Sequence, residues 1–289
     1  MTGQVLDERL DEISGMEAST TLSGAMYVHN DDGEPLIHVI DSDGTDRGSV
    51  RIEEAVNRDW EDLALIHGPG GPLLVIADTG DNLAQHASVQ LYFIPEPVPD
   101  AEGRFSGSVT PMHVLNLEYP GGARDCESVA WDPVSDRLLL ISKRDKPARL
   151  YALSREQALS SSHVVLKQTA TLARFRPPTA RDRVRFGPYD APWVSQPTGM
   201  DIRDDGRQAA IISYRSLYLF DRAEGESWEQ ALARQPLEFE GPPSRKEEAV
   251  SYVAGSHDVM ITTEVVPAPV YRFRLIEGQS VAGDQVPEG

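Results

Sequence analysis

The sequence has almost no cysteine and no long apolar run, and both absences limit what the protein can be. Among its 289 residues Cys126 is the only cysteine, which excludes an intrachain disulfide and a cysteine-based metal cluster. No stretch of about 18 apolar residues occurs, so we expect no membrane insertion. Residues 1–14 are acidic and lack an apolar core. This predicts a cytoplasmic protein from the sequence as given, or an exported one if a leader was removed.

Basic residues are also scarce. The chain has 27 Lys and Arg against 46 Asp and Glu, a formal charge of −19 at pH 7. Nucleic acids and anionic lipids are bound by clustered Lys and Arg, so the acid excess argues against both as partners. It favours cation binding instead. We expect a monomer that binds a small-molecule or protein ligand, whose identity the sequence leaves open.

The familiar catalytic motifs are missing as well. The sequence has no GxSxG, HExxH, P-loop or GxGxxG motif, and its seven histidines show no zinc-binding spacing. No complete set of nucleophile, base and electrophile is visible. The sequence therefore leaves open whether the protein is an enzyme.

What the sequence does contain is many short apolar strands separated by turns. Examples are AMYVH (25–29), PLLVIAD (72–78) and DRLLLIS (136–142). Helical periodicity is confined to short segments at 155–159 and 226–234. This pattern predicts an all-β protein.

The strands recur as five copies of a four-stranded unit. The units start with similar segments at 12–19, 59–66, 125–132, 196–203 and 246–253. The last unit lacks a fourth strand, and segment 3–10 is free to complete it. We therefore predict one five-bladed β-propeller domain over 1–289, closed by the N-terminal strand, with an insert at about 155–195. The alternatives are six blades, a β-sandwich or a β-rich two-domain protein.

Aligning the repeats places one residue from each first strand around a shared axis. These residues are Ser14, Glu61, Glu127, Thr198 and Glu248. The ends of the second strands add Asn30, Asp31, Asp78, Asp81, Lys143, Tyr214 and Glu264. Three converging glutamates repel one another unless a cation or protons offset their charge. The alternatives are a water-filled channel whose carboxylates pair with Lys143 and nearby Arg, or acid–base chemistry by one glutamate.

Oxygen ligands without cysteine suit hard cations, above all Ca²⁺. The expected metal ligands are Glu61, Asp78, Asp81, Glu127, Glu248 and Glu264. In the DTGDN motif (78–82), an Asx-turn that binds only its own backbone explains the acids as well as a metal does. The other expected binding residues are Asn30, Asp31, Thr198 and Tyr214.

One segment reverses the acidic trend. Residues 174–186 contain five Arg and one Asp, whereas residues 1–62 hold 16 acidic and 4 basic residues. Arginine binds phosphate and carboxylate in a bidentate way, so Arg176 and Arg183 are candidates for an anion clamp over the channel mouth. The alternative is a surface loop that pairs with the excess acid of the protein.

The motifs DWED (59–62), DTGDN (78–82) and DCES (125–128) together resemble a family of bacterial β-propellers related to phytase-like proteins. The resemblance covers about 12–275 and implies a propeller that binds calcium or hydrolyses phosphate esters. It maps functional positions to Asp59, Glu61, Asp78, Asp81, Asn82, Asp125, Glu127, Lys143 and Glu248.

Two hypotheses follow for function. In the first, the protein is a binding propeller with a cation in an acidic channel and a ligand or partner on the loop face. In the second, it is a metal-dependent hydrolase that acts on a phosphate ester. There Glu61, Glu127 or Glu248 is the base, while Lys143 and the arginine segment hold the anion. The first is preferred because no complete catalytic set is visible.

Overall fold

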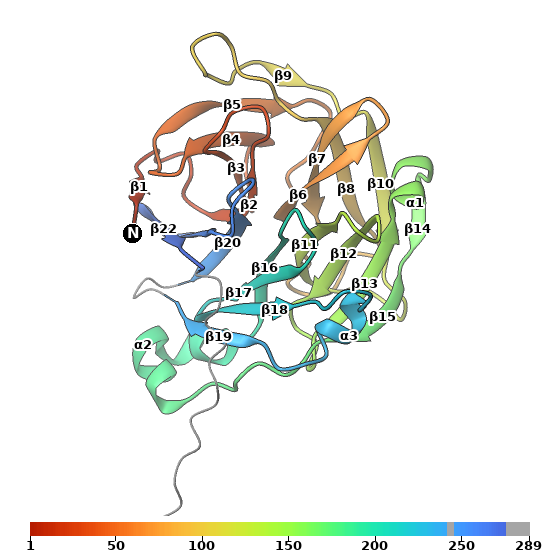
Figure 1. The fold of residues 1–289 in the computed structure, drawn as a ribbon, viewed down its shortest axis with the longest axis vertical. Coiled ribbons are helices and arrows are strands. Elements are labelled where there is room, and N and C mark those ends of the chain that lie inside the picture. The colour runs from red at the N-terminus through yellow and green to blue at the C-terminus, as the bar shows by residue number, and fades with distance from the viewer. Residues whose placement is uncertain (242–245, 276–289) are drawn as a thin grey trace, which may run out of the picture.

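A computed structural model describes residues 1–241 and 246–275. Five small sheets are arranged around an axis (Figure 1). The fold is therefore the predicted five-bladed β-propeller, and the six-bladed alternative is wrong. In the described part of the chain, no helix combines the length and apolar character needed to cross a membrane.

The sheets follow one another in chain order. The first contains β2 (Ile13–Ala18), β3 (Ala25–Asn30), β4 (Leu36–Asp41), β5 (Asp46–Ile52) and β9 (Ser108–Val109). The second contains β6 (Trp60–Gly68), β7 (Gly71–Asp78), β8 (Val89–Pro95), β10 (His113–Glu118) and β14 (His163–Val165). The third contains β11 (Cys126–Asp132), β12 (Arg137–Ser142), β13 (Arg149–Ser154) and β15 (Lys167–Thr171). The fourth contains β16 (Pro197–Ile202), β17 (Gln208–Ser213), β18 (Ser216–Asp221) and β19 (Leu237–Glu240).

The fifth sheet is completed by the N-terminal strand. It contains β20 (Glu247–Tyr252), β21 (Val259–Thr263), β22 (Ala268–Phe273) and β1 (Gly3–Val5). Strand β1 pairs antiparallel with β22, with Gly3 opposite Val270 and Val5 opposite Ala268. This pairing covers the edge of β22 and confirms the predicted closure.

The segment 163–171 is divided between two blades. Strand β14 runs parallel to β10 in the second sheet, whereas β15 pairs antiparallel with β13 in the third. The buried Leu166 separates them, and its N–H donates to the carbonyl of Glu118 at 2.8 Å. One stretch of sequence therefore links two neighbouring blades at their outer edges.

The core lies between neighbouring blades rather than at one centre. Each of the five buried apolar clusters combines side chains from two adjacent sheets. Burying one large aliphatic or aromatic side chain contributes about 1.5–3 kcal/mol. Alternate residues of a strand point to opposite faces of its sheet, so each blade contributes side chains to the clusters on both of its sides.

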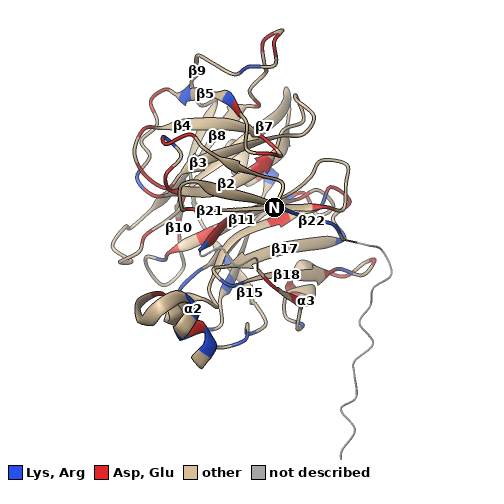
Figure 2. Ribbon diagram, turned by 90° about the vertical axis from the view of Figure 1, so that its left-hand side faces the viewer, with Lys and Arg blue, Asp and Glu red and all other residues tan. Residues whose placement is uncertain are grey.

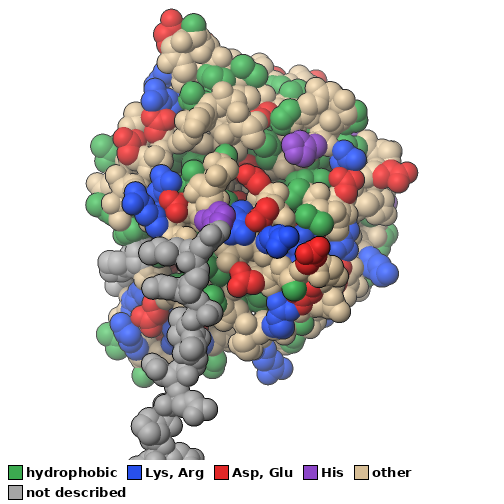
Figure 3. Space-filling view, viewed as in Figure 1, with side chains coloured by type: hydrophobic (Ala, Val, Ile, Leu, Met, Phe, Trp, Pro, Cys, Tyr) green, Lys and Arg blue, Asp and Glu red, His purple; other side chains and the backbone are tan. Residues whose placement is uncertain are grey.

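In the described residues, three short α-helices and one 3₁₀ turn lie outside the strands of the ring. They are α1 (Arg155–Ser160), α2 (Ala180–Asp190), the 3₁₀ turn η1 (Ala191–Trp193) and α3 (Trp228–Ala231). Figure 2 shows α2 outside the stack of sheets, with basic side chains on it. Over the face in Figure 3, acidic and basic side chains are intermingled.

Helix α2 lies in the segment that was expected to be a loop. It begins after Thr179, whose side chain and that of Asp182 form a reciprocal capping box. Gly187, at φ 84°, interrupts the helical backbone before Pro188. Arginine favours helix as strongly as other long side chains do. A count of charges does not test for helix formation, so the helix was not predicted from the sequence.

Candidate functional site

Every first strand has a β-bulge at the same position. The register shifts between Ile13 and Gly15 in β2, and at the corresponding place in β6, β11, β16 and β20. The residues skipped by the pairing are Ser14, Glu61, Glu127, Thr198 and Glu248. A bulge leaves one residue unpaired and redirects its side chain. The five positions aligned from the sequence are thus the five bulged residues.

Four of the five bulged residues line a small polar cavity on the propeller axis, named here the acidic cup; Thr198 does not. Its volume is about 90 Å³. The residues predicted from the sequence that line it are Asp31, Glu61, Glu127, Lys143, Tyr214, Glu248 and Glu264. Ser14 and Asn82 line it as well. Residues from all parts of the chain thus meet where the repeat alignment placed them.

Lys143 is the central cation of the cup. Its ammonium group forms an ion pair with Glu127, with exposed side-chain fractions of 6% and 3%. It also donates to the Tyr214 hydroxyl at 3.3 Å and lies 5.1 Å from the centre of that ring. Burial opposes the ammonium charge, but Glu127 and Glu248 outweigh it and hold the pKa of Lys143 well above its usual value.

The pKa values of the cup's glutamates are raised, which favours their neutral form. Burial raises the pKa of Glu127 to about 8 in spite of Lys143. Burial, followed by the charge of Glu127, raises the pKa of Glu61 well above its usual value. Ser14 Oγ lies 3.0 Å from Glu61 Oε2 and is its hydrogen-bond donor. The cup therefore holds more carboxylates than its single buried lysine neutralises.

Glu248 is a third glutamate in the wall of the cup. It is 6% exposed, and its Oε2 atom has no hydrogen-bond partner. Burial also raises the pKa of this carboxyl well above its usual value. A buried carboxylate oxygen without a donor costs free energy. The cup thus has unsatisfied acceptor capacity.

Two groups of carboxylates among the described residues have the spacing of a metal site: Glu12, Asp31 and Asp32, which are not fully buried, and a buried group that includes Glu61 and Glu127 of the cup. Glu61, Asp125 and Glu127 are all buried, and each offers one oxygen within 4.8 Å of the other two. Asp125 also accepts hydrogen bonds from Arg144 Nε at 2.6 Å and from the Asp81 N–H at 3.0 Å. Asp125 was named by the family resemblance but not by the repeat alignment.

Gly80 leaves room for this group. A Cβ at that position would lie 2.3 Å from both the Asp59 carboxyl carbon and Glu61 Oε1. Burial, followed by the charge of Asp125, raises the pKa of Asp59 to about 6. The glycine of the DTGDN motif therefore lets the loop pack directly on the carboxylates of the cup.

Asp78 and Asp81 lie outside the cup. Asp78 accepts the N–H of Asp59 at 3.0 Å, and its other oxygen lies 3.9 Å from Arg58. Asp81 accepts the N–H groups of Gln85 and His86, both at 2.8 Å. Their carboxylates are used by nearby backbone and side-chain groups, which corresponds to the turn interpretation of this motif.

Four other predicted binding residues do not line the cup: Asn30, Thr198, Arg176 and Arg183. Asn30 Nδ2 donates to the Arg9 carbonyl at 2.7 Å. Thr198 Oγ1 donates to the Glu247 carbonyl at 2.7 Å and joins two first strands. Arg176 pairs with Glu238 and Glu240 at 3.3 and 3.5 Å, and Arg183 is exposed on α2.

Asp62 is a central residue that the sequence reasoning missed. Its carboxylate is fully buried and accepts N–H groups from Leu63 at 2.9 Å, Val129 at 2.8 Å and Met200 at 3.2 Å. These donors come from β6, β11 and β16, so one side chain joins three blades at the axis. Asp62 follows Glu61 in the DWED motif. The other repeats have a small residue at the position of Asp62, and this difference was the available signal in the sequence.

Asp62 lies between the acidic cup and a second cavity at the other ends of the first strands. That cavity is about 270 Å³ and includes Glu17 and Asp201 in its wall. Glu17 accepts the Leu65 N–H at 3.0 Å, and Asp201 accepts the Tyr252 N–H at 2.7 Å. The expected channel is thus divided along the axis, and on the far side two half-buried acids each accept a backbone N–H from the next blade.

Comparison with known proteins supports the propeller fold and does not assign the chain to a family. No protein-family model and no curated protein matches the chain. A solved luciferin-regenerating enzyme matches with a TM-score of 0.50 and 11% identity, over 95% of this chain and 93% of that one. Raptor of Chaetomium thermophilum matches with a TM-score of 0.45 and 12% identity, over 90% of this chain and 20% of that one. The protein is a β-propeller.

Proposed function

We propose that this protein is a binding β-propeller whose acidic cup holds a divalent cation of the calcium type. The observation that carries the proposal is the group Glu61, Asp125 and Glu127, with three oxygens from buried carboxylates within 4.8 Å of one another. Oxygen-only ligands at such spacing are the donors that Ca²⁺ prefers. This set replaces Asp78 and Asp81 of the sequence prediction, whose oxygens are used elsewhere.

The charge of the cup supports the same proposal. Burial raises the pKa of Glu61, Glu127 and Glu248 together, because three carboxylates removed from solvent and close to one another resist ionisation. A divalent cation offsets that charge without protons. Glu248 Oε2, which has no hydrogen-bond partner, supplies a further acceptor in the wall of the cup.

A phosphate-ester hydrolase is the weaker proposal. It needs a free cation to hold the phosphate beside the carboxylates, whereas Lys143 is engaged by Glu127. Arg176 is engaged by Glu238 and Glu240. The kinship to phytase-like propellers remains a proposal, supported by the gathering of DWED and DCES residues at one cup.

Calcium titration of the full chain, followed by thermal melting, tests the cation. A ligand that binds only the folded state stabilises it by about 2.7 kcal/mol at a hundredfold excess over Kd. We expect the Tm to rise with calcium concentration, and calorimetry to report one site per chain. The variants Glu61→Gln and Glu127→Gln should lose both signals.

Glu118→Gln is the matched control, because Glu118 pairs with His163 on the surface and is half exposed. It should respond to calcium as the unchanged protein does. A flat melting curve up to millimolar calcium, together with no calorimetric heat, would overturn the proposal. Equal responses in Glu61→Gln and Glu118→Gln would place any bound calcium elsewhere.

A further inference from the structure

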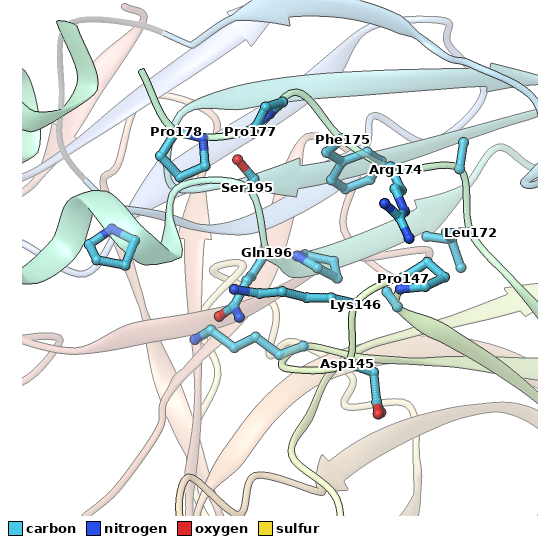
Figure 4. Close-up of a pocket in the computed structure, with 15 residues that line it drawn as sticks. Asp145, Lys146, Pro147, Leu172, Arg174, Phe175, Pro177, Pro178, Ser195 and Gln196 are labelled. Carbon is cyan, nitrogen blue, oxygen red and sulfur yellow. The ribbon is translucent and has the colours of Figure 1, made fainter. Parts of the chain in front are cut away.

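A third cavity lies beside the acidic cup, where the segment 172–197 crosses the turn between β12 and β13 (Figure 4). It is about 300 Å³, and we name it the proline pocket. Its apolar wall includes Pro147, Leu172, Phe175, Pro178 and Pro192. Phe175 stacks on Tyr218 with ring centres 3.8 Å apart and 9° between planes. The wall is therefore preformed, at a volume typical of small-ligand sites.

Gln196 provides the polar contact of the proline pocket. Its side chain is 3% exposed, yet neither Nε2 nor Oε1 has a hydrogen-bond partner. Leaving such a buried group unpaired costs free energy. Figure 4 shows the amide directed into the pocket, toward the end of Lys146. A ligand that contacts this amide would satisfy it.

The charge in the pocket is positive although the protein is strongly acidic. Lys146 and Arg174 line it, and neither makes an ion pair with any residue that the structure describes. Asp145, the acid in the wall, is engaged by Arg124 at 3.5 Å and Arg149 at 3.1 Å. Its carboxylate points away from the pocket in Figure 4. Two cations are thus left without a protein anion.

We propose that the proline pocket binds a small apolar carboxylate. The prolines, Leu172 and Phe175 enclose the hydrocarbon body, while Lys146 and Arg174 face the carboxylate. Gln196 Nε2 donates to a carboxylate oxygen, and Oε1 accepts from an N–H or O–H beside it. The apolar wall favours a carboxylate with a hydrocarbon tail over a bare, strongly hydrated phosphate.

This inference stands without the cation in the acidic cup. Lys143 lines both cavities, but its charge is directed to Glu127 in the cup. The binding test is therefore run with chelator present, which removes any contribution of calcium. A failure of the calcium titration leaves this result unaffected, and the reverse also holds.

The test is calorimetric titration of the full chain with 4-phenylbutyrate, octanoate, 4-phenylbutyramide and phenyl phosphate. We expect the two carboxylates to bind at least tenfold more tightly than the neutral amide, because only they engage Lys146 and Arg174. Tighter binding of phenyl phosphate would overturn the carboxylate assignment. Equal binding of acid and amide would overturn the role of the two cations.

Three variants locate the binding. Lys146→Met and Gln196→Leu keep most of the side-chain volume and should each weaken 4-phenylbutyrate binding about tenfold or more. Lys167→Met removes one exposed charge of β15 outside the pocket and should leave binding unchanged. Circular dichroism melting identifies any variant that fails to fold, in which case Lys146→Gln replaces it. No heat with either carboxylate, or equal loss in all three variants, would overturn the proposal.

Discussion

The Lys143 ammonium and the Glu127 carboxylate form an ion pair at the propeller axis, with at least nine-tenths of each side chain buried. Lys143 directly follows β12 and Glu127 is the bulged residue of β11, so both come from the third blade. Lys143 also lines both the acidic cup and the proline pocket.

Lys143→Met should strongly destabilise the fold. Removing one partner of a buried ion pair leaves an uncompensated charge and costs about 3–5 kcal/mol. Urea unfolding should therefore show a lower midpoint with an unchanged slope. The double variant Lys143→Met/Glu127→Gln should recover part of the loss, because it removes the stranded carboxylate.

Lys246→Met is the comparison, because Lys246 pairs with Glu264 where both side chains are partly exposed. Such pairs contribute about 0–1 kcal/mol. Similar losses in Lys143→Met and Lys246→Met would contradict a special role for the buried pair.

Asp62→Ala should be among the most damaging single changes. It leaves three buried N–H donors on three blades without an acceptor, at about 1–3 kcal/mol each. Asp62→Asn keeps one acceptor oxygen and should lose less. Chemical unfolding measures both, with the exposed Glu53→Ala as control. A loss below that of Asp62→Asn, or equal to that of the control, would refute the axial role of Asp62.

Asp201 should make stability depend on pH. Burial raises the pKa of Asp201 to about 7, although the Tyr252 and Ile202 N–H groups oppose the shift. Because the folded pKa lies above the unfolded one, this contribution to stability is complete below about pH 4 and is lost as pH rises through 7. Asp201→Asn should flatten the decline in unfolding free energy between pH 4 and 7. Glu156→Gln, on the surface of α1, should leave the slope as it is.

Arg215→Met should release α2 from the ring. The guanidinium of Arg215 is 1% exposed, donates to Asp182 at 2.9 Å and also donates to the Arg176 carbonyl at 2.5 Å. Its loss breaks this buried ion pair, at about 3 kcal/mol, although Asp182 keeps its Thr179 donors and the Arg176 carbonyl keeps Ser195 Oγ. Hydrogen exchange should accelerate in residues 176–190 more than in the blades, whereas Arg181→Met should leave exchange unchanged. Uniform acceleration would instead indicate global destabilisation.

The sequence predicted the ring and its axis because its repeats can be aligned with one another. Glu61, Glu127 and Glu248 occupy equivalent bulges, so one periodic pattern located all three. Asp78 and Asp81 were harder to place, because a carboxylate in a tight turn serves a metal or a backbone N–H equally well. Only the positions of the Asp59, Gln85 and His86 N–H groups decide between them.

The proline pocket was beyond the reach of the same reasoning. Arg174 lies in an insert that no other repeat contains, so there was nothing to align it with. Gln196 begins the aligned segment 196–203, but much of the pocket wall around it comes from that insert. Arg176 and Arg183 were singled out as anion-binding candidates for their charge, yet Arg176 contacts acids of β19. A charge count cannot tell which arginines the protein neutralises itself.

The pairing of β1 with β22 also has a kinetic consequence. It joins residues more than 260 positions apart, whereas each of the other blades is assembled mainly from neighbouring hairpins. The entropy of closing a loop grows slowly, by about 0.6 kcal/mol for each doubling of its length, so the long closure costs little at equilibrium. It is nevertheless the least local contact in the ring, and such contacts form late. We therefore expect folding to end, and unfolding to begin, at this seam.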